Sequence, residues 1–112
     1  MTDPAPLNAL FQALADPTRR AVLARLSAGP QPAGALAEPF GMALPSFMEH
    51  LKKLESGGLI ETRKQGRTRI CALRPGALAP ARDWMEEQRA LWDARLDNLE
   101  DHLATLMKER PR

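Results

Sequence analysis

The spacing of apolar residues near the start of the chain predicts a short amphipathic helix. Leu7, Leu10, Phe11 and Leu14 recur at positions i, i+3, i+4 and i+7, so one helical face carries all four. Residues 1–6 include two prolines and are expected to form a flexible arm. The helix is therefore expected to begin at Leu7.

Two more short helices are expected to follow. Asp16 and Pro17 suit the start of the first of these helices. Aspartate can cap a helix, and the backbone N–H that proline lacks would have no partner within the first helical turn. The second helix covers residues 33–38, turns Leu36 inward and is stopped by Pro39.

Residues 44–56 predict a helix with two distinct faces. At 100° per residue, Phe47, Leu51 and Leu54 gather on one side and are expected to face the core. The glycine pair that follows Ser56 ends the helix. The opposite face and its flanks carry Pro45, Ser46, Met48, Glu49, Lys52 and Lys53.

A basic hairpin is expected directly after this helix. Strands over residues 59–64 and 68–73 are joined by a turn around Gly66. Its tip gathers four cations: Arg63, Lys64, Arg67 and Arg69. Because like charges this close repel one another, the arrangement favours an anionic partner. The competing explanation is that charge protects an exposed β-edge from aggregation.

The last third of the chain predicts one long helix. Residues 79–110 are rich in Ala, Leu, Glu and Arg and contain no proline after Pro80, which leaves residues 111–112 as a tail. Apolar side chains follow the spacing of a coiled-coil seam at Trp92, Leu96, Leu99, Leu103 and Leu106. Burying each one is worth ~1.5–3 kcal/mol, so the stripe needs a cover. A second copy of the chain is the simplest cover, with the helix of residues 7–14 completing the interface. Folding back on the chain's own core is the alternative.

Composition limits the class of protein. The 112 residues fit one small domain, and a net charge of +2 does not by itself indicate a nucleic-acid partner. The charge is segregated, however, because five basic residues and no acid lie from Arg63 to Arg74, whereas seven of the 14 acids lie from Asp83 to Asp101. The single cysteine excludes an internal disulfide, no apolar run reaches ~18 residues, and no export pattern begins the chain. We therefore expect a cytoplasmic protein without membrane contact.

A helix over residues 44–56 followed by a basic hairpin over residues 59–73 is the order of a winged helix-turn-helix. We therefore expect a mainly α fold with an α+β wing, in which residues 7–76 form the winged helix-turn-helix domain and residues 77–110 a long C-terminal dimerisation helix. Double-stranded DNA is the expected partner.

The outer face of the helix over residues 44–56 supplies two kinds of contact to DNA. Ser46, Met48 and Glu49 lie near its N-terminal end, where they can reach base edges. Lys52, Lys53 and the cations of the hairpin can neutralise phosphates, although two adjacent lysines alone also fit a solvated helix face. Arg19 and Arg20 are further candidates for phosphate contacts.

Two other classes of function remain. No Gly-rich phosphate loop or Ser/His/Asp set can be assembled, so neither an enzyme nor a cofactor is expected. The alternative to a DNA-binding regulator is a protein-interaction module that binds a partner through its C-terminal helix. Glu49 on the reading face favours that alternative, and the basic hairpin argues against it.

Four residues have both a structural and a functional interpretation. His50 borders the core of its helix, so a hydrogen bond that fixes the helix is favoured over a base contact. Cys71 is expected to be a buried, inert strand residue, with redox sensing as the alternative. Trp84 and Trp92 are expected to pack, with the lining of a ligand pocket as the alternative.

The chain from Leu10 to Leu73 resembles the ArsR/SmtB family of bacterial winged-helix repressors, through LADPTRRAVLARL, GALAEPFGM and HLKKLESGGLIETRKQGR. Leu-Pro-Ser at the start of the fourth helix, with Trp84, Trp92, Leu96 and Asp97, resembles a branch that lacks metal sites. The resemblance implies a homodimer, joined through its first and last helices, that represses transcription from a palindromic operator. It leaves the effector unknown.

The metal sites of this family are not expected here. The Cys-x-Cys pair of many relatives is absent from residues 34–38, and the last helix offers only Asp101, His102 and Glu109. One histidine without a thiol is a poor ligand set for a transition metal, so no metal is expected. Met48 and Glu49 also differ from the residues usual in the family, which leaves the operator sequence open.

Overall fold

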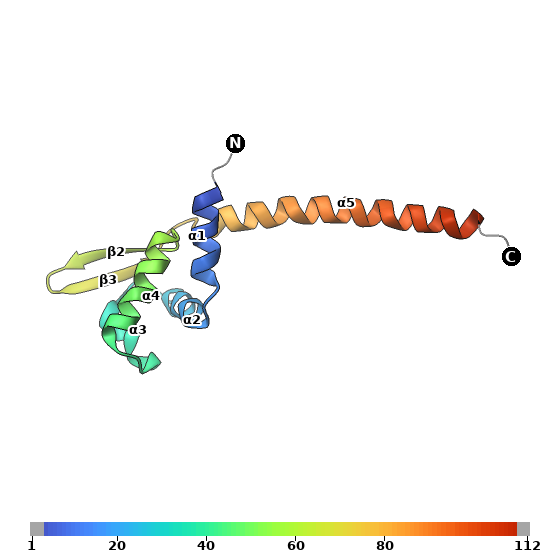
Figure 1. The fold of residues 1–112 in the computed structure, drawn as a ribbon. Helices are drawn as coiled ribbons and strands as arrows, with labels where there is room; N and C mark the ends of the chain where they lie inside the picture. The colour runs from blue at the N-terminus through green and yellow to red at the C-terminus, as the bar shows by residue number, and fades with distance from the viewer. Residues whose placement is uncertain (1–3, 110–112) are drawn as a thin grey trace. The chain divides into compact units, whose positions relative to one another are not determined.

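The structure of the chain is a computed structural model that describes residues 4–109 and divides into two compact units, Met1–Ala81 and Arg82–Arg112. In the described part of the first unit, helices pack against one face of a small antiparallel sheet (Figure 1). The hairpin of that sheet projects beyond the helices.

Four α-helices precede the hairpin within the described residues. They are α1 (Pro4–Leu14), α2 (Pro17–Leu26), α3 (Ala33–Ala37), which a 3₁₀ turn over Glu38–Phe40 extends, and α4 (Leu44–Ser56). The α4 helix has the bounds that its sequence predicts. The α2 helix is capped as expected, because the Asp16 carboxylate accepts a hydrogen bond from the backbone N–H of Arg19 at 3.1 Å.

The first helix begins earlier than its apolar spacing indicates. It starts at Pro4, so residues 4–6 belong to α1 and the prediction of an arm over residues 1–6 is wrong for them. Residues 1–3 lie outside the described residues. Two prolines are compatible with this start, because the first four amides of a helix have no partner within the helix.

The sheet has the strand order β1-β3-β2, with both pairs antiparallel. Its strands are β1 (Gln31–Pro32), β2 (Ile60–Gln65) and β3 (Thr68–Leu73), and Gly66 takes a φ of +66° in the turn between β2 and β3. The hairpin confirms the predicted wing. The two-residue strand β1 was not predicted, because two residues containing a proline carry no alternating pattern.

The core of the first unit joins all of its helices to the sheet. Its most completely buried large side chains are Val22, Leu36, Phe47, Leu54, Leu59, Ile60 and Cys71. The predicted inward face of α4 is confirmed, since Leu51 is also 2% exposed. The burial of Cys71 likewise agrees with its expected place in a strand.

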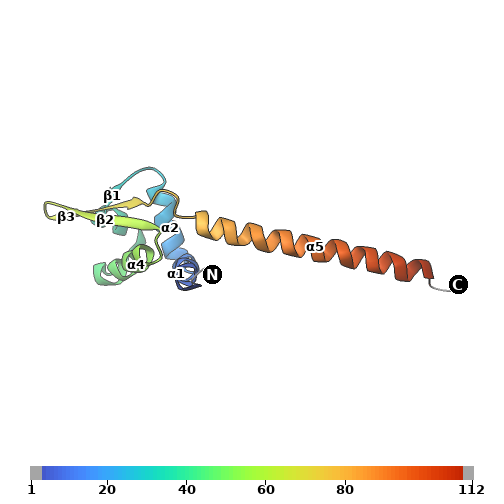
Figure 2. The ribbon, with the colours of Figure 1, turned by 90° about the horizontal axis from the view of Figure 1, so that it is seen from above.

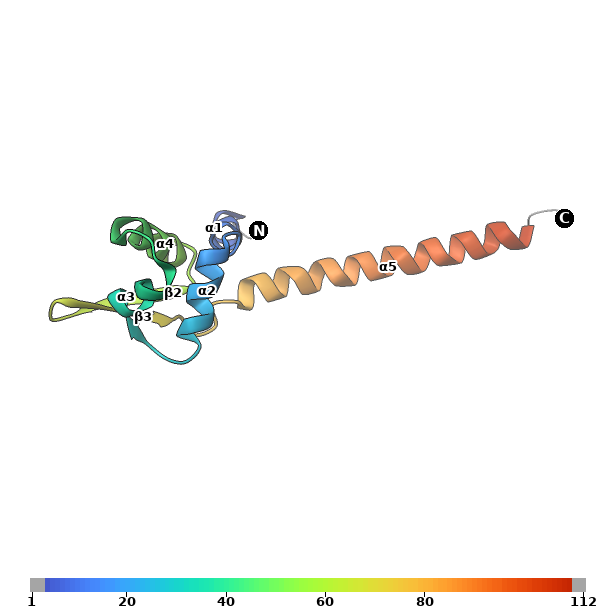
Figure 3. The same ribbon diagram turned by 90° about the horizontal axis from the view of Figure 1, so that it is seen from below.

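Helices α1 and α4 lie side by side (Figures 2 and 3). Gly57, at the end of α4, makes this possible, because a Cβ there would lie 2.9 Å from the Cβ of Ala13 and 3.0 Å from the carbonyl oxygen of Ala9. Leu10 is 3% exposed in this contact, so it belongs to the chain's own core and offers little surface to a partner. Leu7, Phe11 and Leu14 are half-buried.

The long helix α5 (Ala79–Glu109) begins at the end of the first unit and forms the described part of the second. It starts at Ala79, as its composition predicts, and Arg110 lies outside the described residues. Its predicted apolar seam is exposed in the single chain, from 48% at Leu103 to 64% at Trp92. Arg89 pairs with Glu86 and Asp93 at helical spacing, on the charged part of the helix.

Across residues 4–109, no helix is both long enough and apolar enough to cross a membrane.

Candidate nucleic-acid interface

The exposed face of α4 is the first part of the candidate interface. Pro45, Ser46, Glu49, Lys52 and Lys53 are all exposed, as the helical pattern predicts. Met48 is half-buried and packs against the core, so less of its side chain is available to a partner. The helix has no side-chain cap at Ala43. Amides of its first turn are thus left without a side-chain acceptor.

The wing supplies the second part of the interface, and its cations are divided between two faces. Lys64 lies opposite Arg69 in the strand register, and Arg63 lies opposite Ile70. Because successive side chains of a strand alternate, Lys64 and Arg69 share the face turned toward α4, whereas Arg63 shares the outer face with Ile70. Of the four cations, only Arg67 lies in the turn itself. All four are exposed, with Lys64, Arg67 and Arg69 close to the turn and Arg63 apart from them on the outer face.

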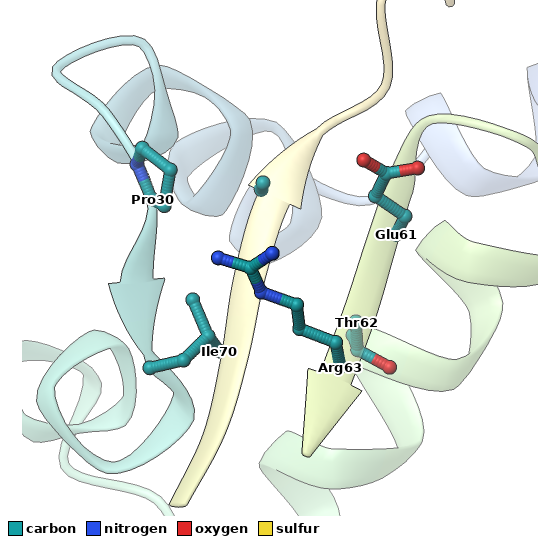
Figure 4. Close-up of a pocket in the computed structure, with 6 residues that line it drawn as sticks. Pro30, Glu61, Thr62, Arg63 and Ile70 are labelled. Atoms are coloured by element: carbon teal, nitrogen blue, oxygen red, sulfur yellow. The ribbon is translucent and has the colours of Figure 1, made fainter. Parts of the chain in front are cut away.

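Figure 4 shows the outer face of the sheet, where Arg63 extends from β2 across β3. The side chains around it enclose a shallow hollow of about 440 Å³ that Pro30, Ile70 and Ala72 line on its apolar side. Arg63 is therefore separated from Lys64 and Arg69, which lie on the α4 side of the wing.

A chain of hydrogen bonds joins the end of α4 to the wing. The Glu55 carboxylate oxygen Oε2 accepts from the Thr62 hydroxyl at 2.7 Å and from the Thr62 backbone N–H at 3.2 Å. The Thr62 hydroxyl in turn accepts from Arg69 Nη1 at 2.9 Å. Sequence reasoning missed Glu55 and Thr62. The only signal for them was an acid in the last turn of a helix that precedes a basic hairpin.

A cleft of about 310 Å³ lies between α4 and this part of the wing. It is lined by Glu49 and Lys52 from α4 and by Arg69 from β3, together with the Glu55–Thr62 link. Met48 also lines it, so the structure brings three predicted α4 residues and one predicted wing residue to the same cleft.

Arg19 anchors α4 from the other side and is not available for phosphate. It is 9% exposed, its Nε donates to the Ala13 carbonyl at 2.8 Å, and its Nη2 donates to the Gln12 carbonyl at 2.8 Å. Its Nη1 lies 3.2 Å from His50 Nδ1. The hypothesis that Arg19 contacts phosphate is therefore wrong, because its guanidinium is committed to α1 and α4.

His50 has the structural role that its place on the helix predicts. Arginine can only donate, so Nδ1 of His50 is the acceptor in this hydrogen bond. The Asp16 carboxylate lies 3.8 Å from the same nitrogen, which is too far for a hydrogen bond. The backbone N–H of Arg19, aided by the nearby charges, holds the pKa of Asp16 below its ordinary value.

Arg20 and Cys71 have local roles in the fold. Arg20 Nη1 donates to the Leu14 carbonyl at 2.7 Å while the side chain stays exposed. Burial raises the pKa of the Cys71 thiol, which favours the unreactive protonated form.

Among the described side chains, no three of His, Cys, Asp and Glu lie close enough together to hold a metal ion.

A helix with a buried apolar face and an exposed polar face, followed at once by a basic antiparallel hairpin, defines a winged helix-turn-helix protein. A helix-turn-helix domain model matches residues 14–63. One solved ArsR family transcriptional regulator is 54% identical, covers 82% of this chain and 95% of its own, and superposes with a TM-score of 0.78. The chain belongs to the ArsR family of transcriptional regulators.

Two further relatives carry informative descriptions. The transcriptional repressor SdpR of Bacillus subtilis is 34% identical over 79 residues, which are 70% of this chain and 88% of SdpR. The homodimeric winged helix-turn-helix DNA-binding domain of a possible ArsR-family regulator from Mycobacterium bovis is 26% identical. It has a TM-score of 0.62 and covers 77% of this chain and 80% of its own.

Proposed function

We propose that this chain is a homodimeric transcriptional repressor that binds a palindromic operator in double-stranded DNA. One observation carries the proposal: the exposed face of α4 adjoins the α4 side of a basic wing across a single cleft, so one surface offers both base-reading and phosphate-binding groups. The repressor description of SdpR and the homodimeric, DNA-binding description of the M. bovis domain support it.

The α4 helix is proposed to enter the major groove. Pro45, Ser46 and Glu49 are exposed near its N-terminal end, where the Glu49 carboxylate can accept a hydrogen bond from a cytosine amino group. Met48 contributes the exposed part of its side chain as an apolar contact. Lys52 and Lys53 bind phosphates along the groove and set the register of the helix.

The wing is proposed to bind the neighbouring phosphates through its two faces. Lys64 and Arg69 serve the face toward α4, Arg67 serves the turn, and Arg63 serves the outer face. These contacts add affinity that depends on salt and carries little sequence information.

Dimerisation is proposed to occur through α5 and the exposed part of α1. The α5 seam consists of Trp92, Leu96, Leu99, Leu103 and Leu106, and α1 adds Leu7, Phe11 and Leu14. A dimer places two α4 helices on half-sites about 34 Å apart, one turn of B-DNA. We place this dimer in the cytoplasm, where it reaches its operator.

Footprinting on the DNA that flanks the chain's own reading frame tests this function. We expect a protected palindrome and an affinity that falls steeply with salt. Replacing both Arg67 and Arg69 by alanine should reduce the slope of log K against log salt by about 0.9 for each phosphate that the protein no longer neutralises. The matched control is Arg82→Ala, which removes an exposed arginine of α5. An unchanged slope in the double variant would remove the wing from the interface, and absence of any protected site would refute the function.

A further inference from the structure

The negative charge of Glu55 is unfavourable both for the helix that carries it and for the proposed DNA ligand. It lies in the last turn of α4, where the negative end of the helix dipole disfavours an acid. It also lines the cleft between α4 and the wing, where its charge repels phosphate. An acid in such a place weakens both folding and DNA binding unless it makes offsetting interactions.

The hydrogen bonds of Glu55 supply that offset and have a fixed direction. Glu55 carries no hydrogen to donate when ionised, so the Thr62 hydroxyl must donate to it and use its lone pairs to accept from Arg69. The hydroxyl therefore cannot rotate away without breaking one of the two bonds. Three side chains from α4, β2 and β3 thus hold one another in a single arrangement.

This arrangement places a cation where a phosphate would pass. Arg69 is exposed and lines the same cleft as Lys52, so its guanidinium is held beside α4 and not free in solvent. Long arginine side chains lose conformational freedom on binding, and a side chain ordered beforehand loses less. The Thr62 hydroxyl engages Nη1, which leaves other guanidinium N–H groups for a ligand.

We propose that Glu55 is a positioning residue for DNA binding, which holds Arg69 in the α4–wing cleft through Thr62 so that Arg69 meets a phosphate beside the recognition helix. The inference rests on the proposed function and deepens it. It assigns an acid of the interface a favourable effect on binding to a polyanion.

The sign of one mutation separates this role from that of an ordinary surface acid. If Glu55 only repels phosphate, Glu55→Ala tightens DNA binding. If it positions Arg69, Glu55→Ala and Thr62→Val each weaken binding to the footprinted operator by about three- to tenfold, the range for loss of one or two hydrogen bonds. Thr62→Ser keeps the hydroxyl and should bind like the unaltered protein. Glu61→Ala, on the outer face of the same strand, is the matched acid control and should bind equally well or more tightly.

A double-mutant cycle with Arg69→Ala completes the test, with affinities measured by fluorescence anisotropy at several salt concentrations. Glu55→Ala should lose its weakening effect on DNA binding in the Arg69→Ala background. Each single variant should reduce the slope of log K against log salt by the amount expected for about one phosphate contact per protomer. Thermal unfolding followed by circular dichroism identifies folded variants, and the Thr62→Val and Thr62→Ser pair carries the test if Glu55→Ala does not fold. Failure of the unaltered protein to bind refutes the proposed function. If the unaltered protein binds its operator, two results refute only the positioning role of Glu55. One is tighter DNA binding by Glu55→Ala, and the other is an effect of Glu55→Ala that simply adds to that of Arg69→Ala.

Discussion

Two adjacent arginines close the C-terminal end of α1 in this fold. The last carbonyls of a helix have no partner within the helix, and here Arg19 reaches those of Gln12 and Ala13 while Arg20 reaches that of Leu14. Cations also suit this end of a helix dipole. Arg19 does this from a buried position and contacts His50 as well, so a single side chain of α2 links α1 to α4.

We expect Arg19→Met to lower the free energy of unfolding by about 2–3 kcal/mol, because it leaves buried carbonyls without their charged donor. The matched substitution Arg20→Met should have an effect within about 1 kcal/mol, since Arg20 is exposed and water can replace its hydrogen bond. Urea unfolding followed by circular dichroism measures both. Equal effects of the two substitutions would show that burial does not distinguish them.

The contact between α1 and α4 depends on a glycine at the end of an element. We expect Gly57→Ala to destabilise the protein by about 1–3 kcal/mol, because the new methyl group would overlap Ala13 and the α1 backbone. Gly34 in α3 has a negative φ and open space where a Cβ would lie, so Gly34→Ala should instead stabilise by about 0.4–1 kcal/mol. Thermal unfolding of the two variants should therefore shift in opposite directions. A shift in the same direction would contradict the packing argument.

At the scale of elements, local pattern predicts what local forces determine. The bounds of α4 follow from apolar spacing between Pro45 and a glycine stop, and the hairpin follows from strand residues around Gly66. The strand β1 pairs with β3, which is distant in sequence, so no local signal marks it. The start of α1 was misjudged because prolines suit the first turn of a helix as well as a flexible arm.

The candidate site follows the same rule. The exposed residues of α4 were predictable from helical periodicity, but the Glu55–Thr62–Arg69 link depends on the register of two strands against a helix. Arg19 was misassigned as a phosphate ligand for a similar reason, since a sequence does not show that a surface-type side chain is buried against a helix end.

At the scale of the whole molecule, α5 presents a long apolar surface to solvent. The five seam side chains are each about half exposed or more. The free energy gained by burying them in a dimer is comparable to the free energy of unfolding of a small domain. Dimerisation also couples two DNA contacts, because a second half-site is then bound at a high effective concentration. Disrupting the α5 seam should thus reduce the affinity for a full palindrome far more than the affinity for a single half-site.

We expect Leu99→Glu to convert the dimer to a monomer, because two carboxylates would be buried at the seam without partners. The control Thr105→Glu adds the same charge about 120° away on the helix and should remain dimeric. Sedimentation velocity at about 10 µM, a concentration at which a specific dimer persists, distinguishes the two species.

Leu99→Glu should also lose most of its preference for a palindrome over a half-site, while half-site binding stays within about threefold because α4 and the wing lie in the other unit. A Leu99→Glu protein that remains dimeric would require an interface other than the α5 seam, and the two DNA substrates would then show whether that interface still pairs the recognition helices.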